Sequence, residues 1–309
     1  GFRFKPGAVR PRQHGHAQTG TGIAMTGPSG LERSCGNDWL RMAPPDEGFR
    51  RIEAFFSGHA YAPHRHDTYA IGYTMEGVQS FHYRGTRADS TAGRIIVIHP
   101  DELHDGQAGC EAGFHYRMLY IEPALIRDAL VPAASALPFV KEAVFSDPRL
   151  LPALQAACGS LGSPLHPLLR DQMLSVLADG LLSHDRSAAV RPRGRADLQA
   201  VELARGFLEA HADRAVRSEE LEAVTGLDRY SLARQFRTVL GTSPYRYLTM
   251  RRLERARGAI SGGQSLAGAA ALAGFSDQAH MTRQFRAAYG MPPGSWQRLV
   301  RAQEPAAPG

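Results

Sequence analysis

The chain has 309 residues, of which 43% are hydrophobic, so it is long enough for two domains with apolar cores and is not a wholly disordered protein. Its formal net charge of +6 comes almost entirely from arginine, because Lys5 and Lys141 are the only lysines, and this charge permits an anionic partner, although arginine bias can equally reflect genome composition. The sequence contains no run of roughly 20 apolar residues for a membrane span and no export signal, and its three separated cysteines (Cys35, Cys110, Cys158) exclude a disulfide framework and fit a cytoplasmic protein.

The N-terminal third divides into a lead and a strand-rich segment. Residues 1–45 are rich in Gly, Pro, Thr, Arg and His, and we expect them to be disordered or loosely attached. From Arg50 to Ile121, β-branched and aromatic residues alternate with Gly turns. Turns are expected at Glu76-Gly77 and Arg84-Gly85, and Pro100 and Pro123 end two of the strands. Strands are predicted at 69–75, 78–83, 94–99 and 115–121. This pattern predicts an all-β sandwich or barrel.

The periodicity becomes helical after this segment. A short helix is predicted at 124–130 and a longer one at 165–182, whose apolar stripe is formed by Leu169, Met173, Val176 and Leu177. Such a stripe is either a core face or part of a homodimer contact. Residues 185–197 are rich in Arg with Pro and Gly and are predicted to form a linker.

The C-terminal third contains an internal repeat. Arg234-Gln-Phe-Arg237, followed by Gly241 and Pro244, recurs as Arg283-Gln-Phe-Arg286, followed by Gly290 and Pro293. The offset between the copies is constant (283 − 234 = 49), and Tyr247 corresponds to Trp296 at the same offset. A repeat of this length indicates one supersecondary unit used twice. The preceding residues predict two short helices joined by a tight turn, which is a helix-turn-helix.

The first unit is predicted to contain helices at 219–224 and 229–240, separated by a turn at Thr225-Gly226. Asp228 is the expected N-cap of the second helix, and Gly241 is its expected end. With about 100° per residue, one face of this helix is apolar and the opposite face is polar. The apolar face contains Leu232, Phe236, Val239 and Leu240, and the polar face contains Tyr230, Arg234 and Arg237.

The second unit follows the same plan. Its first helix is predicted at 266–273 with Ser265 as cap, and Gly274-Phe275 forms the turn. Ser276 is the expected cap of the second helix, which buries Met281, Phe285 and Ala288 and exposes Gln278, Thr282, Arg283 and Arg286. Gln can read adenine and Arg can read guanine through paired hydrogen bonds. A single such face would be an ordinary polar surface, but two faces with the same caps favour DNA reading.

A connecting helix is predicted between the units, from Pro244 to about Ile260. Its apolar stripe steps by four, four, three and four residues, and five arginines occupy the rest of its surface. A helix of this length spans about 25 Å and would hold two recognition helices in adjacent segments of the major groove, about 34 Å apart. The predicted DNA site is therefore long and asymmetric.

The segment from about 198 to 298 resembles the DNA-binding domain of the AraC/XylS family. The resemblance rests on Leu221-Glu-Ala-Val-Thr-Gly226, Gly241-Thr-Ser-Pro244, Ala273-Gly-Phe-Ser-Asp-Gln278 and Gly290-Met-Pro-Pro293, in addition to the repeat itself. It implies base contacts from Tyr230, Ala233 and Arg234 in the first unit and from Gln278, Ala279, Thr282 and Arg283 in the second. The polar faces independently contain five of these seven residues. Arg229, Arg237 and Arg286 complete the predicted DNA-binding set.

The upstream segment resembles the cupin-type sensor domain common in this family. Pro63-His-Arg-His66, Glu76-Gly77 and Pro100-Asp-Glu-Leu-His104 carry the resemblance. His64, His66 and His104 match the three histidines of a cupin metal site, but no carboxylate stands near 69–71, so no metal or other cofactor is predicted. We expect these histidines, with Tyr69 and Tyr73, to line a small-molecule site instead.

The predicted fold is therefore α+β with two domains: a cupin-like β-barrel with helices at 46–184 and an all-α double helix-turn-helix at 198–300, followed by a tail at 301–309. The predicted function is sequence-specific DNA binding for transcription regulation under control of a small-molecule effector, without enzymatic activity. The alternative is a cupin metalloenzyme with an accessory DNA-binding domain. The predicted partners are double-stranded promoter DNA, the effector and a second copy of the chain in a homodimer. The resemblance adds RNA polymerase, as for an activator, although the sequence does not separate activation from repression. No membrane association is expected.

Overall fold

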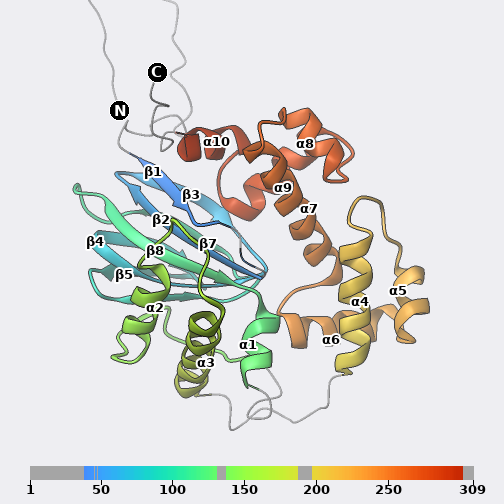
Figure 1. The fold of residues 1–309 in the computed structure, drawn as a ribbon, viewed down its shortest axis with the longest axis horizontal. Coiled ribbons are helices and arrows are strands. Elements are labelled where there is room, and N and C mark those ends of the chain that lie inside the picture. The colour runs from blue at the N-terminus through green and yellow to red at the C-terminus, as the bar shows by residue number, and fades with distance from the viewer. Residues whose placement is uncertain (1–37, 45, 47, 131–136, 187–196, 302–309) are drawn as a thin grey trace, which may run out of the picture. The chain divides into compact units, whose positions relative to one another are not determined.

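The computed structural model describes residues 38–44, 46, 48–130, 137–186 and 197–301 (Figure 1). It has a strand-rich N-terminal part and a helical C-terminal part, which confirms the predicted α+β class with two kinds of domain. Residues 1–37, most of the predicted linker and the predicted tail beyond Arg301 lie outside the described residues. None of the described helices combines the length and apolarity needed to cross a bilayer.

The N-terminal part is built on a nine-stranded sheet among the described residues. The strands are β1 (Trp39–Met42), β2 (Phe49–Phe56), β3 (His59–His64), β4 (Tyr69–Tyr83), β5 (Thr86–Thr91), β6 (Ile95–Ile98), β7 (His104–Ala108), β8 (Phe114–Ile121) and β9 (Val144–Phe145). The main order is β1-β2-β8-β4-β6-β9, while β5 and the β3–β7 pair join the second half of β4. The expected closed barrel is not formed, because this path of strands does not return to its start.

Two local predictions in this part are wrong. Glu76-Gly77 is not a hairpin turn: β4 continues through it with a register shift between Thr74 and Glu76 in its pairing with β8. Gly77 allows this because its φ is +72° and a Cβ there would lie 2.0 Å from the Gly113 carbonyl oxygen. Trp39–Met42, assigned to the loosely attached lead, instead forms the edge strand β1, which buries Leu40 against β2.

The two faces of this sheet are both buried, which explains why β4 lacks a simple polar and apolar alternation. One face, which includes Ile71, Val97 and Leu119, packs under helices α1 (Pro123–Leu130), α2 (Leu150–Cys158) and α3 (Pro167–His184). The other face, which includes Phe81 and Met118, belongs to a core that also contains residues of the helical part, such as Phe285. Met173 and Leu177 of α3 are buried in the core on the first face, so these two residues of the predicted stripe serve intramolecular packing.

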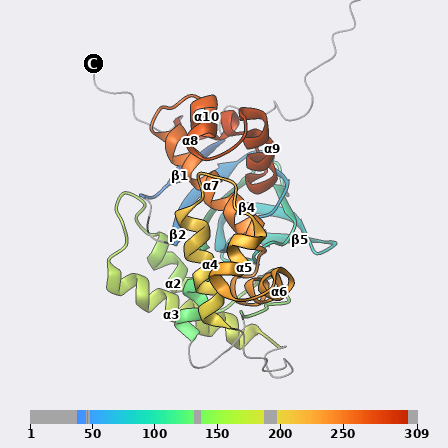
Figure 2. The ribbon, with the colours of Figure 1, turned by 90° about the vertical axis from the view of Figure 1, so that its right-hand side faces the viewer.

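The C-terminal part contains seven helices in its described residues. They are α4 (Leu198–Ala210), α5 (Ser218–Thr225), α6 (Arg229–Leu240), α7 (Pro244–Ser261), α8 (Leu266–Leu272), α9 (Gln278–Tyr289) and α10 (Pro293–Arg301). Helices α5–α6 and α8–α9 are the two predicted helix-turn-helix units, and Figure 2 shows α7 passing between the two groups of helices. The helix positions predicted from the sequence are thus confirmed to within one or two residues.

The predicted caps explain most of these boundaries. The Asp228 carboxylate accepts from the amides of Tyr230 and Ser231, and the Ser265 hydroxyl accepts from Gly268. Gly241 and Gly290 end α6 and α9 in the left-handed conformation. The expected Ser276 cap is wrong: Asp277 caps α9, because its carboxylate lies one residue closer and accepts from the His280 amide at 2.6 Å.

The substitution Gly77→Ala tests the continuous β4. Alanine at this position would have to adopt the left-handed backbone conformation, which costs about 1–2 kcal/mol. Its Cβ would also clash with the Gly113 carbonyl oxygen. We expect urea unfolding to show a loss of stability of at least that size. Gly58→Ala is the matched control, because no atom lies within 4 Å of the new Cβ. Equal, small effects of the two substitutions would contradict the described path of β4.

Candidate DNA-binding surface and effector cavity

Helix α6 presents the polar face that its sequence predicts. Leu232, Phe236 and the rest of the apolar stripe are buried, at most 2% exposed. On the opposite side Tyr230 is 71% exposed, and Arg234 and Arg237 are exposed as well. The Arg234 guanidinium donates to the Ser231 hydroxyl at 2.9 Å, which leaves most of its donors directed to solvent. An exposed phenol beside exposed guanidiniums suits contact with a DNA groove.

Two further residues predicted for α6 differ from this picture. Arg229 is held on α5 by ion pairs with Glu222 and Glu219, both at 2.9 Å. These contacts compete with DNA, so the structure favours a role for Arg229 in fixing the angle between α5 and α6. Ala233 is only partly exposed and offers a methyl group.

Helix α9 carries the second polar face. Met281, Phe285 and Ala288 are buried, as predicted. The residues predicted to contact DNA gather on the other side, where all are exposed except the partly buried threonine: Gln278, Ala279, Thr282, Arg283 and Arg286. The first turn of a recognition helix is the part that enters the groove, and Gln278, Ala279 and Thr282 belong to it or follow it directly.

A buried ion cluster links the helical part to the strand-rich part through α7. The guanidinium of Arg251 lies 2.9 Å from the Asp67 carboxylate and 2.6 Å from the Glu122 carboxylate, and Glu254 on the same helix lies at 3.2 Å. Asp67 is 2% exposed, and burial raises the pKa of its carboxyl group while Arg251 opposes that rise. The opposite charges of Arg251 and its carboxylate partners compensate each other, which allows α7 to bury them against the strand-rich part.

Main-chain hydrogen bonds at α9 and an ion pair at α6 add to this contact. The amides of Ala62 and Arg65 donate to the carbonyls of Gly290 and Ala287 at the end of α9, each at 3.0 Å. At the end of α6, Arg237 lies 3.4 Å from the Asp101 carboxylate. Both recognition helices therefore touch the strand-rich part with their C-terminal ends.

Two adjoining cavities lie between the strands and helices α7, α9 and α10. Their volumes are about 50 and 340 Å³, and they share the lining residues Met42, Arg50, Tyr120 and Arg257. The smaller cavity is mostly apolar and aromatic, and Tyr289 and Trp296 close its helical side. A site of this size fits a small organic molecule.

The cavity walls contain two arginines with few acidic partners. The guanidinium of Arg50 lies 3.2 Å from Glu254 and stacks over Tyr120. Arg257 stacks over Tyr289 and Trp296, and within the described part of the chain no carboxylate lies within ion-pair distance of it. Burial, followed by the charge of Arg50, lowers the pKa of Arg257. Asp46, Glu122 and Glu254 line the larger cavity, but no carboxylate among the described residues lines the smaller one, so this arrangement favours an anionic group in the smaller cavity.

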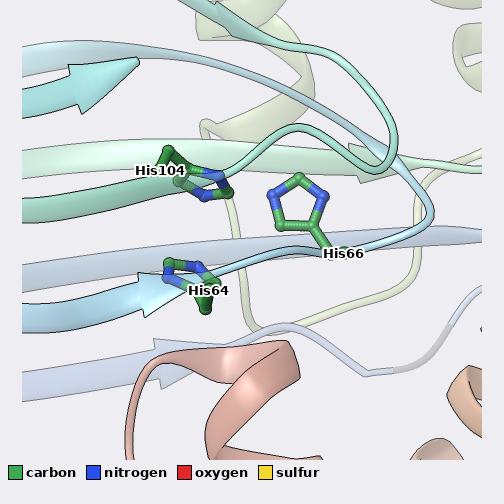
Figure 3. Close-up of side chains that lie close together, drawn as sticks. All are labelled: His64, His66 and His104. Atoms are coloured by element: carbon green, nitrogen blue, oxygen red, sulfur yellow. The ribbon is translucent and has the colours of Figure 1, made fainter. Parts of the chain in front are cut away.

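The structure brings together only part of the predicted ligand set. His64, His66 and His104 form one buried cluster (Figure 3), and His64 and His66 also line the smaller of the two cavities. Tyr69 and Tyr73 point to the other face of the sheet, where they pack in the core under the helices, and the Tyr69 hydroxyl donates to the Pro138 carbonyl at 2.9 Å. They do not share a cavity with the three histidines. Strand alternation correctly placed Tyr69 and Tyr73 on the same face of the sheet, but it did not show which face a ligand can reach.

Sequence reasoning missed Arg50, Arg251 and Arg257. The sequence predicted a polar surface for the arginines of α7. In the structure Arg251 instead pairs with Asp67 and Glu122 of the strand-rich part, and Arg257 lines both cavities. The apolar residues Leu253, Ala256 and Ile260 gave a signal for Arg257, which lies about 40° around the helix from Leu253, but none for Arg251, which lies about 160° from it.

Comparison with known proteins supports both halves. The sequence model of the AraC-like ligand binding domain matches residues 48–178, and that of a helix-turn-helix domain matches residues 221–299. The HTH-type transcriptional regulator YbfI of Bacillus subtilis is 24% identical over 235 residues, which cover 74% of this chain and 86% of YbfI. LumQ of Photobacterium leiognathi, named as a probable transcriptional regulator, is 31% identical over 96 residues, which cover 31% of this chain and 39% of LumQ.

Solved structures of similar fold include ToxT from Vibrio cholerae. One ToxT structure matches with a TM-score of 0.60 at 11% identity, covering 82% of this chain and 99% of ToxT. A ToxT structure described as bound to an unsaturated fatty acid matches with a TM-score of 0.58 at 12% identity, covering 86% of this chain and 98% of ToxT. The two-domain architecture is therefore shared with ToxT.

The substitution Arg251→Met tests the buried ion cluster. It leaves the Asp67 carboxylate buried without its partner, which typically costs about 3–5 kcal/mol. We expect a loss of stability of this order in urea unfolding and partial recovery in the double variant Arg251→Met, Asp67→Asn. Arg255→Met, an exposed position on the same helix, is the control. A loss no greater than that of the control would show that the cluster does not join the two parts.

Proposed function

The chain belongs to the AraC-type family of DNA-binding transcription regulators, and we propose that α6 and α9 read two adjacent segments of one promoter site. The observation that supports this proposal is the pair of exposed polar faces on two capped helices of the same plan. Their reading residues differ, since Tyr230 and Arg234 stand on one and Gln278, Thr282 and Arg283 on the other. We therefore propose an asymmetric DNA site.

We further propose that the effector is an anionic amphiphile bound in the cavities between the sensor and α7. Arg50 and Arg257 would hold its carboxylate, and the aromatic and aliphatic walls would hold its apolar body. The fatty-acid-bound ToxT structure supports this class of ligand by analogy. Because the cavity is lined by both parts of the chain, a ligand there has different contacts in different domain arrangements, which is what control of DNA binding requires.

Regulation of a promoter also suggests where the protein acts, how it acts and in which assembly. We propose action in the cytoplasm as an activator that contacts RNA polymerase, with a homodimer as the assembly to be tested. Catalysis is not proposed: the relatives are transcription regulators, and the cupin metalloenzyme alternative lacks a carboxylate beside the three histidines at Tyr69, Ala70 or Ile71.

The substitution Arg283→Ala tests direct reading of bases. If Arg283 reads one base pair, its loss relaxes preference at that position by about 1–3 kcal/mol and leaves other positions unchanged. The measurement is DNA selection with purified full-length chain at fixed salt, followed by gel shifts. Arg87→Ala removes the same charge from strand β5, outside both helix-turn-helix units, and serves as the control. A uniform loss on all sequences would instead assign Arg283 to a phosphate.

Ligand-induced stabilisation tests the effector class. A straight-chain fatty acid below its micellar concentration is expected to stabilise the chain, by about 2.7 kcal/mol at 100 times its Kd, while its methyl ester is not. Arg257→Met should remove this effect because it removes the unpaired guanidinium, whereas Arg255→Met should keep it. Equal stabilisation by acid and ester, or an unchanged response of Arg257→Met, would contradict the proposed site.

A further inference from the structure

Three imidazoles meet inside the sensor domain at the ends of β3 and β7. His64 and His104 come from β3 and β7, and His66 comes from the segment directly after β3. Their ring centroids are 4.1 Å apart for His64 and His104, 4.8 Å for His66 and His104 and 6.1 Å for His64 and His66. One ligand nitrogen from each lies within 4.8 Å of the other two (Figure 3).

The backbone fixes the orientation of all three rings in the same way. Each Nδ1 lies within hydrogen-bond distance of a carbonyl oxygen two residues away: Ala62 for His64, Thr68 for His66 and Glu102 for His104, at 2.8–3.0 Å. A carbonyl can only accept, so each Nδ1 carries the hydrogen and each Nε2 carries a lone pair. Histidines that bind metal ions are usually oriented in this way, with one ring nitrogen donating to a carbonyl or carboxylate and the other free to bind the metal.

At least one of these Nε2 atoms accepts no hydrogen bond from the protein. The Nε2 of His66 is fully buried and has no hydrogen-bond partner among the described residues. The three side chains are 5%, 3% and 9% exposed, and no carboxylate belongs to the cluster. Burial lowers the pKa of all three imidazoles, that of His104 to about 4.

We propose that His64, His66 and His104 bind a divalent first-row transition-metal ion such as Zn²⁺ through their Nε2 atoms. Neutral imidazoles suit Zn²⁺, Co²⁺, Ni²⁺ and Cu²⁺ and do not suit Mg²⁺ or Ca²⁺, which require oxygen ligands. Nitrogens bound at 2.0–2.1 Å around a tetrahedral ion lie roughly 3.4 Å apart, so small rotations of the rings would complete the site.

Oxygen donors for the remaining coordination position are present in the adjoining cavity. This cavity, of about 30 Å³, is lined by His64 and His104 and also by Gln79. The Gln79 Oε1 atom is buried without a hydrogen-bond partner. It is available to the ion or to a water molecule on the ion. Asp105 also lines this cavity, but its carboxylate accepts from the His82 amide at 2.6 Å and lies 3.0 Å from the His82 ring nitrogen, so the proposed set has an amide where a cupin metal centre has a carboxylate.

Cobalt titration of the full-length chain, made without a polyhistidine tag and freed of metal by a chelator, tests the proposal. We expect about one Co²⁺ per chain, with visible absorption bands of a low-coordinate site that Zn²⁺ then abolishes. His66→Gln should remove these bands and lower Zn²⁺ affinity at least tenfold. His211→Gln is the control, because His211 is the C-cap residue directly after α4 and does not belong to the cluster.

The outcomes separate the site from accidental binding. Bands of equal strength in the wild type and in His66→Gln would assign the cobalt to other residues and overturn the proposal. Binding of less than about a tenth of an equivalent of Co²⁺ by the wild-type protein would also overturn the proposal. His104→Gln provides a second variant, and circular dichroism without metal verifies that each variant is folded before titration.

Discussion

The buried guanidinium of Arg251 is the interaction on which the arrangement of the described chain depends. It stands on α7, whose apolar side also packs against both helix-turn-helix units, and it reaches Asp67 and Glu122 of the sensor domain. A charge removed from water requires partners in a fixed geometry. The cluster therefore fixes where α7 lies on the sensor, and α7 in turn positions α6 and α9. The bonds from Ala62 and Arg65 to the end of α9 strengthen the same contact.

This constraint connects the proposed sites to one another. Arg257, which faces the effector cavities, lies six residues after Arg251 on the same helix. Strand β3, which carries His64, also holds the end of α9. A ligand changes the balance between two domain arrangements only if it binds them with different affinity. The cavities meet this condition because residues of both domains line them.

The sequence predicted the helical half well because its signals are local. Asp228, Gly241, Pro244 and Ser265 fix their helix ends through bonds to near neighbours, and the stripe at Leu232 and Phe236 needs only the helical period. The strand half depends on distant partners. Gly77 resembles a turn residue until its approach to Gly113 is known, and Tyr69 resembles a pocket residue until α1–α3 cover its face. Likewise, Arg251 and Arg257 resemble surface residues until the sensor packs against them.

The central claim is that α7 holds two unlike recognition helices on one asymmetric site. Hydroxyl-radical footprinting of the full chain on DNA selected for tight binding tests it most directly. The account predicts two protected segments on one face of the duplex, with centres about 10–10.5 base pairs apart and unlike sequences. One protected segment, or two inverted copies of the same sequence, would contradict it, because the first needs only one helix and the second needs two equivalent readers.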